Sequence, residues 1–306
     1  MIRPEPMRGV YAPILTPVRE DYSPDVERWI AHAQWLLENG CHGLAPFGTT
    51  SEANSFSVEE RIGMLERLVG AGLPAEQMIV GVGCCAFPDT VRLAAHATEL
   101  GAGGVLMLPP FYYKDVSDEG IFRAVAEAIE RVADDRLRVY LYHIPPIAQV
   151  GFSLELIDRL VSMFPQIVVG IKDSSGNPGN LAGILDRFFG FGTFAGSEKL
   201  LLQTLRGGGV GTISALANII PAQIRHLYDN WQSPEAETIQ AGLNHLREAL
   251  KPYPVIPALK QMVATWRDDS GWLSVRPPLV ALPHARALEL LALRPVAEWL
   301  GDMTTA

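Results

Sequence analysis

Short apolar runs alternate with amphipathic stretches along most of the chain. Apolar runs bounded by glycine or polar turns are typical of strands buried on both faces, and apolar positions every three to four residues are typical of helices. The predicted strands cover residues 11–16, 43–46, 78–83, 104–108, 138–143, 167–171, 193–196 and 209–214. This alternation predicts parallel strands connected by helices.

Several helix starts carry recognisable capping residues. Ser57 followed by Glu60 is the pattern of a capping box, so a helix is expected to begin there. Earlier in the chain, Ser23 followed by Pro24 predicts another helix, with Ser as N-cap and Pro at the first helical position, running to about residue 39. Both predicted helices lie between predicted strands, as the alternation requires.

The number and spacing of these units indicate the fold class. Eight strand–helix units in about 230 residues have the size of a (β/α)8 TIM barrel. An open, doubly wound α/β sheet is the alternative fold. Helical patterns near residues 234–251, 257–266 and 283–299 follow the last strand. We therefore expect a catalytic barrel over residues 1–230 and a C-terminal helical extension over residues 231–306.

Composition narrows the function classes. The 306 residues are 48% hydrophobic and 19% charged, with a net charge of −9 and no basic cluster, which argues against nucleic acid and anionic membrane surfaces as partners. The three cysteines show no zinc spacing and are expected to be reduced. No signal-like segment and no apolar run of about 18 residues is present, so a cytoplasmic protein is expected.

The run QIVVGIKD contains the candidate nucleophile. Lys172 follows the apolar residues 167–171 directly, so its amine is expected in or beside a dry interior, where desolvation disfavours the charged form of an amine. A neutral lysine attacks ketones and forms a Schiff base. The alternative is an ordinary ion pair between Lys172 and Asp173.

Other strand ends carry groups suited to the same chemistry. Gly48, Thr49 and Thr50 follow the second strand, and a turn of backbone N–H groups with two hydroxyls suits a carboxylate. Tyr142 and His143 end the fifth strand. In a barrel these residues share one face, so a tyrosine–threonine proton relay to the lysine is plausible. Structural roles as helix caps and core tyrosines are the alternatives.

With these motifs in order, the chain resembles the dihydrodipicolinate synthase/N-acetylneuraminate lyase family of pyruvate-dependent class I lyases. The motifs are GTTSE, FYYK, YHIP, GIKD and GTIS, and the resemblance extends from GVYAPILTP to VRPPLVALP. It implies a lyase that needs no metal or organic cofactor and acts on a small 2-oxo acid. It also implies a homotetramer built as a dimer of dimers.

The resemblance implies a role for each matching residue. Lys172 would be the Schiff-base lysine, and Tyr142 would shuttle protons at the imine. Thr49 and Thr50 would hold the pyruvate carboxylate, with Thr49 also in the proton relay. Tyr113 would be the relay tyrosine that neighbouring subunits exchange. In the GTIS segment, Ile213 would border the pyruvate pocket.

Three positions depart from the family pattern. Ser51 replaces the second glycine of GTTGE, and His143 replaces the asparagine after the fifth-strand tyrosine. Ile147 stands where true dihydrodipicolinate synthases have an arginine that grips the carboxylate of the second substrate, so no bidentate clamp is present there. We therefore expect aldol cleavage, condensation or dehydration of a 2-keto-3-deoxy acid, with Ile147 beside the variable part of the substrate. His143 has two readings, a substrate contact or a structural strand-end histidine.

Other functions remain as alternatives. The first is authentic synthesis of 4-hydroxy-tetrahydrodipicolinate from pyruvate and aspartate semialdehyde. The second is a non-catalytic 2-oxo-acid-binding protein on the same scaffold. GVGCCA matches the dinucleotide fingerprint, although the expected acidic residue falls at Glu99 within a helical pattern. The histidines show no metal-ligand spacing, which argues against a metal-dependent aldolase.

Overall fold

Eight parallel strands form the centre of the protein in the computed structural model, which describes residues 4–305. The strands are β1 (Gly9–Ala12), β2 (Gly43–Leu44), β3 (Ile79–Gly81), β4 (Gly104–Met107), β5 (Val139–His143), β6 (Val168–Asp173), β7 (Gly192–Ala195) and β8 (Gly211–Ile213). Their carboxyl ends all point to the same side, which is where a parallel barrel carries its site.

The sheet closes on itself. Its strand order is β2-β1-β8-β7-β6-β5-β4-β3, so the first strand pairs with the last. A parallel bridge between Leu44 and Met78, and a hydrogen bond of 2.8 Å from Gly81 N to Pro46 O, bring β2 beside β3. An open doubly wound sheet has two free edges and no such pairing, so the TIM-barrel prediction is confirmed.

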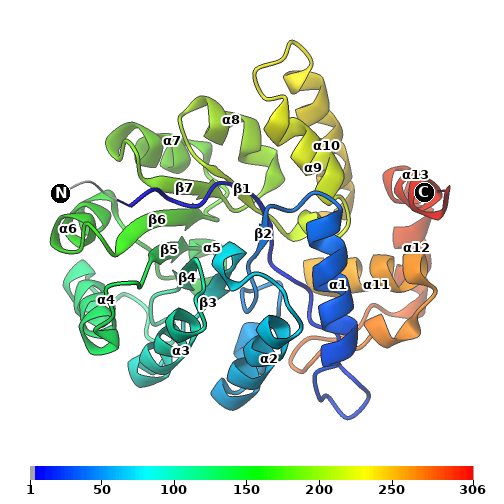
Figure 1. Ribbon diagram of the computed structural model, residues 1–306. Coiled ribbons are helices and arrows are strands. Elements are labelled where there is room, and N and C mark those ends of the chain that lie inside the picture. The colour runs from blue at the N-terminus through cyan, green and yellow to red at the C-terminus, as the bar shows by residue number, and fades with distance from the viewer. Residues whose placement is uncertain (1–3, 306) are drawn as a thin grey trace.

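Helices surround the barrel and extend beyond it (Figure 1). They are α1 (Val26–Glu38), α2 (Val58–Gly70), α3 (Phe87–Glu99), α4 (Asp118–Val132), α5 (Pro145–Ala148), α6 (Leu154–Met163), α7 (Pro178–Arg187), α8 (Leu201–Arg206), α9 (Pro221–Asp229), α10 (Ala236–Leu250), α11 (Val255–Arg267), α12 (His284–Ala292) and α13 (Arg294–Thr305). Figure 1 shows α11, α12 and α13 together on the side of the barrel next to α1. Within residues 4–305, no helix is both long and apolar enough to span a membrane.

Alternation along the strands divides the apolar side chains into two layers. On β5, Tyr140 and Tyr142 belong to the cluster that fills the barrel interior. Val139 and Leu141 belong to the larger cluster between the sheet and the helices. Successive strand residues point to opposite faces, so Tyr140 and Tyr142 point into the barrel, whereas Val139 and Leu141 point toward the helices.

The expected helix starts are partly confirmed. The capping box at Ser57 and Glu60 is present, with Ser57 Oγ accepting from Glu60 N at 3.1 Å. The helix predicted to run to about residue 39 is present, but its predicted start is wrong, because Asp25 is the N-cap and accepts from Arg28 N at 3.1 Å. Ser23 is unavailable as a cap because its hydroxyl donates to Asp21 Oδ1 at 2.6 Å.

Two other boundaries differ from the pattern. The apolar residues after Ala12 lie in a buried loop rather than in β1, where Leu15 N donates to Asn218 Oδ1 at 2.9 Å. The single helix expected over residues 283–299 is interrupted, since Leu293 is extended and α13 begins after it. Pro295 in the next turn has no N–H with which to continue α12.

Candidate active site

Lys172 and Tyr142 lie side by side at the carboxyl ends of β6 and β5. They are register partners in the parallel pairing, and each residue is 4% exposed. Lys172 Nζ lies 3.5 Å from Tyr142 Oη and 4.5 Å from the centroid of the tyrosine ring. The amine therefore lies inside the barrel mouth, against an aromatic ring, with one hydroxyl within hydrogen-bonding distance.

The neighbouring carboxylate does not pair with this amine. Asp173 follows Lys172 on the same strand, so its side chain points to the opposite face. Its Oδ1 accepts from Ser175 N at 2.9 Å, and no ion pair joins it to Lys172 within the part of the chain that the structure describes. The ion-pair alternative for Lys172 therefore has no support in the geometry.

Thr49 extends the polar contact from Tyr142 across the mouth. Thr49 Oγ1 lies 3.1 Å from Tyr142 Oη. The amine of Lys172 and the hydroxyls of Tyr142 and Thr49, from three separate segments, thus form a continuous series of contacts, the Lys172–Tyr142–Thr49 line. The backbone around Thr49 is tightly turned, with Ser51 N donating to Gly48 O at 3.1 Å and Glu52 N donating to Thr49 O at 3.0 Å. This turn presents the hydroxyl of Thr49 toward the barrel interior.

A small cleft opens beside this line of groups. Gly48, Thr49 and Tyr142 are among its lining residues, together with glycines and leucines at the carboxyl ends of β3 and β4. Thr50 is buried next to it. Ile213, on β8, is fully buried and belongs to the same interior cluster as Tyr142. The cleft has a volume of about 20 Å³, and the hydroxyl-bearing residues Thr49 and Tyr142 that line it connect it to the amine of Lys172.

Two further candidate residues lie at the rim. Tyr113 is 73% exposed, and its ring packs edge-on against Tyr112 with centroids 5.3 Å apart. Lys114 Nζ donates to Ala148 O at 2.8 Å and so ties this loop to α5. Ile147, on α5, is 62% exposed. Within a single chain, neither Tyr113 nor Ile147 touches the Lys172–Tyr142–Thr49 line.

His143 faces away from the mouth. It follows Tyr142 on β5 and therefore points into the layer between sheet and helices. Its Nδ1 accepts from Phe152 N at 2.9 Å, which leaves the proton of the neutral ring on Nε2. Burial lowers the pKa of His143, and the nearby Asp173 acts in the opposite direction. These contacts fit a structural role for His143 at the end of β5 rather than a contact with the substrate.

The turn that carries Thr49 is anchored by residues that the sequence did not indicate. Glu52, at the end of the turn and in the left-handed region at φ 57°, pairs with Lys260 of α11. Its other oxygen accepts from Arg276 N at 2.9 Å. The end of the GTTSE motif marks Glu52 as noteworthy, but its partners lie far along the chain and have no spacing signal.

The glycines of the GVGCCA run lie in close contacts with neighbouring strand ends. A Cβ atom at Gly81 would lie 2.0 Å from Phe47 O, and one at Gly83 would lie 2.4 Å from Leu108 Cβ. The glycines of GVGCCA are therefore explained by close packing around the mouth. Between residues 4 and 305, no cluster of three His, Cys, Asp or Glu side chains is placed to hold a metal ion.

Comparison with known proteins shows the class of this barrel, which is a lyase of the class I type. Residues 6–293 match the model of the Dihydrodipicolinate synthetase family, and the chain belongs to this family. It is 35% identical over 303 residues to an uncharacterized DapA-like lyase of Chloroflexus aurantiacus, covering 97% of this chain and 98% of that protein. It is also 35% identical over 245 residues to a probable mitochondrial 4-hydroxy-2-oxoglutarate aldolase of Emericella nidulans, covering 76% and 77%. Among solved structures, dihydrodipicolinate synthase from Agrobacterium tumefaciens has a TM-score of 0.86 and 32% identity, covering 92% of this chain and 96% of that one.

Proposed function

We propose that this lyase acts on pyruvate or a longer 2-oxo acid through a Schiff base on Lys172. The observation that carries the proposal is the continuous line from Lys172 Nζ to Tyr142 Oη and on to Thr49 Oγ1, with separations of 3.5 and 3.1 Å. A buried amine supplies the nucleophile, and the two hydroxyls supply and remove protons.

The reaction begins when the neutral amine of Lys172 attacks the keto carbon of the substrate. The carbinolamine that forms loses its hydroxyl as water, after Tyr142 delivers a proton to that oxygen. The resulting protonated imine withdraws electrons from the adjacent carbon. In a 4-hydroxy-2-oxo acid, the deprotonated Tyr142 then accepts the proton of the 4-hydroxyl, and the bond between carbons 3 and 4 breaks, which releases an aldehyde and leaves an enamine. Protonation of the enamine and hydrolysis of the imine return pyruvate and free Lys172.

Gly48, Thr49 and Thr50 form the proposed site for the substrate carboxylate. They combine backbone N–H groups with two hydroxyls in one turn, and Thr49 Oγ1 is connected to the Lys172 amine through Tyr142 Oη. Ile213 supplies an apolar wall from β8. A carboxylate held there leaves the keto carbon facing Lys172, which is the orientation that attack requires.

We also propose an oligomeric state for the protein and a location in the cell. Tyr113 is exposed in the single chain, and a neighbouring subunit would bring such a tyrosine to the Thr49–Tyr142 pair. We infer a homotetramer built from two dimers, in which Tyr113 crosses between subunits. The expected location is the cytoplasm.

Covalent trapping tests the proposal. Incubation with pyruvate and borohydride is expected to leave a reduced adduct on Lys172, detected by mass spectrometry of peptides. Lys172→Ala is expected to give neither adduct nor turnover, whereas Lys114→Ala removes a lysine at the rim and is expected to keep the adduct. An adduct on any other lysine, or none, would reject the assignment.

The substrate beyond pyruvate is addressed by a screen. We propose a 2-keto-3-deoxy acid or 4-hydroxy-2-oxo acid as substrate, supported by the similarity to the probable 4-hydroxy-2-oxoglutarate aldolase. Aspartate semialdehyde is the competing substrate, supported by the similarity to the Agrobacterium synthase. Because Ile147 offers no carboxylate clamp, we expect condensation with aspartate semialdehyde to fail. Efficient condensation would establish the synthase instead.

A further inference from the structure

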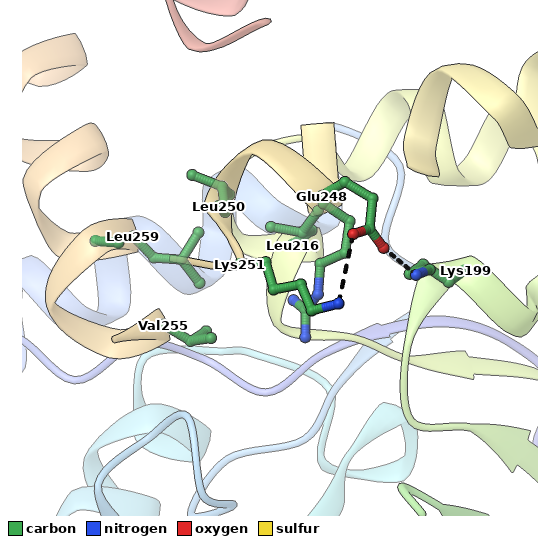
Figure 2. Close-up of a pocket in the computed structure, with 9 residues that line it drawn as sticks. Lys199, Leu216, Glu248, Leu250, Lys251, Val255 and Leu259 are labelled. Atoms are coloured by element: carbon green, nitrogen blue, oxygen red, sulfur yellow. Dashed lines mark hydrogen bonds and ion pairs between the residues drawn. The ribbon is translucent and has the colours of Figure 1, made fainter. Parts of the chain in front are cut away.

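A second pocket lies at the carboxyl ends of β7 and β8, on the same side of the barrel as Lys172. Its volume is about 290 Å³. Lys199 enters it from the short helix after β7 (Glu198–Leu200), and Leu216 enters it from the one after β8 (Ala215–Asn218). The end of α10 and the start of α11 form the opposite wall (Figure 2). The C-terminal helices thus complete a pocket at the barrel mouth.

Positive charge predominates in this pocket. Lys199, Arg247 and Lys251 line it, and Glu248 is the single carboxylate among its lining residues. Figure 2 shows Glu248 between the two lysines, with Lys251 Nζ 3.8 Å from Glu248 Oε2 and Lys199 bonded to the other oxygen. In a chain of net charge −9, these three cations outnumber the two carboxylates that they face, Glu248 and Glu198.

The cations around Glu248 stabilise its negatively charged form. The hydrogen bond from Lys199 lowers the pKa of Glu248, and the charges of Lys199, Lys251 and Arg247 lower it further. Arg247 also faces the buried Glu198, with Nε 3.8 Å from Oε1, while Ser214 donates to the other oxygen of Glu198. This contact fixes the guanidinium at the pocket wall.

The rest of the wall is apolar. Leu216, Leu250, Val255 and Leu259 line the pocket beside the charged groups. In Figure 2, Leu250, Val255 and Leu259 come from the two C-terminal helices and lie across from Lys199. Apolar walls with a few convergent polar or charged groups are typical of sites that bind small organic molecules.

We propose that the Lys199–Arg247–Lys251 pocket binds an organic carboxylate. Two sources of this group fit the position. One is the far carboxylate of a 2-oxo diacid, since Lys199 follows β7, which pairs directly with the Lys172 strand β6 at a spacing of about 5 Å. This source rests on the proposed function. The other is a separate dicarboxylate effector, which would bind whatever reaction Lys172 performs.

Direct binding tests the pocket itself. Glutarate is titrated into the full-length protein by calorimetry at low salt. We expect saturable binding that weakens as salt is added and at least tenfold in the double variant Lys199→Ala/Lys251→Ala. Arg206→Ala is the matched control, because Arg206 pairs with Glu237 at the other end of α10 and lies outside the pocket. Equal affinity in the wild type and the double variant, or no binding to the wild type, would overturn the proposal.

Kinetics then separate the two sources. The double variant is compared with wild type on 4-hydroxy-2-oxoglutarate, which has a second carboxylate, and on 2-keto-3-deoxygluconate, whose tail is neutral. A tenfold or larger rise in KM for the diacid alone identifies the substrate as the source. Unchanged KM for both, together with lost glutarate binding, identifies a separate effector. Failure of the Schiff-base proposal would appear as the absence of a pyruvate adduct, whereas glutarate binding is measured without turnover.

Discussion

Glu52 and Lys260 form an ion pair in which both side chains are completely buried. Glu52 ends the turn that presents Thr49, and Lys260 belongs to α11 of the C-terminal extension. Lys260 Nζ also donates to Ser274 O at 2.8 Å. Burial lowers the pKa of Lys260, and the charge of Glu52 counteracts this effect. The C-terminal helices therefore position the candidate active site as well as covering one side of the barrel.

Loss of one partner from this pair is expected to be costly. Lys260→Met leaves the Glu52 carboxylate buried without its cation, and breaking a buried pair in this way costs about 3–5 kcal/mol. We expect this loss in urea unfolding, together with a higher KM for the 2-oxo acid because the turn around Thr49 is no longer fixed. The double variant Glu52→Gln/Lys260→Met removes both charges and should recover part of the stability. Additive losses in the double variant would show that the two residues do not interact.

Tyr142 and Tyr140 offer a matched pair of substitutions on one strand. Both face the barrel interior, but Tyr142 Oη contacts Lys172 and Thr49 whereas Tyr140 Oη accepts from Met7 N at 2.7 Å. Tyr142→Phe removes the proposed proton donor and is expected to lower kcat about 10²- to 10⁴-fold. Tyr140→Phe is expected to lower stability by about 0.5–1.5 kcal/mol, because the partly buried Met7 N–H loses its acceptor, with kcat nearly unchanged. Equal kcat losses in both variants would reject the proposed role of Tyr142.

Substitution of the two exposed tyrosines after β4 tests whether the active site is shared between subunits. Tyr112 and Tyr113 are 74% and 73% exposed, so burial in the chain does not distinguish them. If Tyr113 serves a neighbouring subunit, Tyr113→Phe lowers kcat about 10²-fold while Tyr112→Phe does not. Mixing Tyr113→Phe subunits with Lys172→Ala subunits should restore activity, because each hybrid dimer contains one site with both groups. A fully active monomer in light scattering would contradict this arrangement.

The residues at the barrel mouth could be predicted from the sequence because each directly follows a recognisable strand pattern. Lys172 follows an apolar run, and Tyr142 and Thr49 follow two others, so a barrel necessarily brings them to one face. The direction of His143 was open because the sequence does not show which residue of β5 points inward. Once Tyr142 is seen to face the interior, alternation settles the direction of its neighbour.

The contacts between distant segments were not predictable in the same way. Glu52 and Lys260 come from opposite ends of the chain, and neither lies in a spacing pattern that names the other. The first helix boundary was missed for a different reason, since Ser23 and Asp25 are both good caps. Ser23 is engaged by Asp21, which leaves Asp25 as the cap. Competition of this kind depends on the three-dimensional turn and not on residue type.

The buried His32 gives the stability a defined pH dependence. Its Nε2 lies 3.2 Å from Asn218 Oδ1, and Arg267 Nη2 lies 3.4 Å from its Nδ1, so the neutral ring fits both neighbours. Burial, reinforced by the charge of Arg267, lowers its pKa from 6.5 to about 3.

The sign of this dependence follows from proton binding. Below pH 6.5 the unfolded chain protonates His32 while the folded protein does not, so its contribution is complete above pH 6.5 and declines as the pH falls toward 3. At about 1.4 kcal/mol per pH unit, the wild type should lose about 2 kcal/mol more than His32→Gln between pH 6.5 and pH 5. Urea unfolding of both proteins across this range measures the difference, in which the other titrating groups cancel. Parallel stability curves would mean that His32 is protonated equally in the folded and unfolded states.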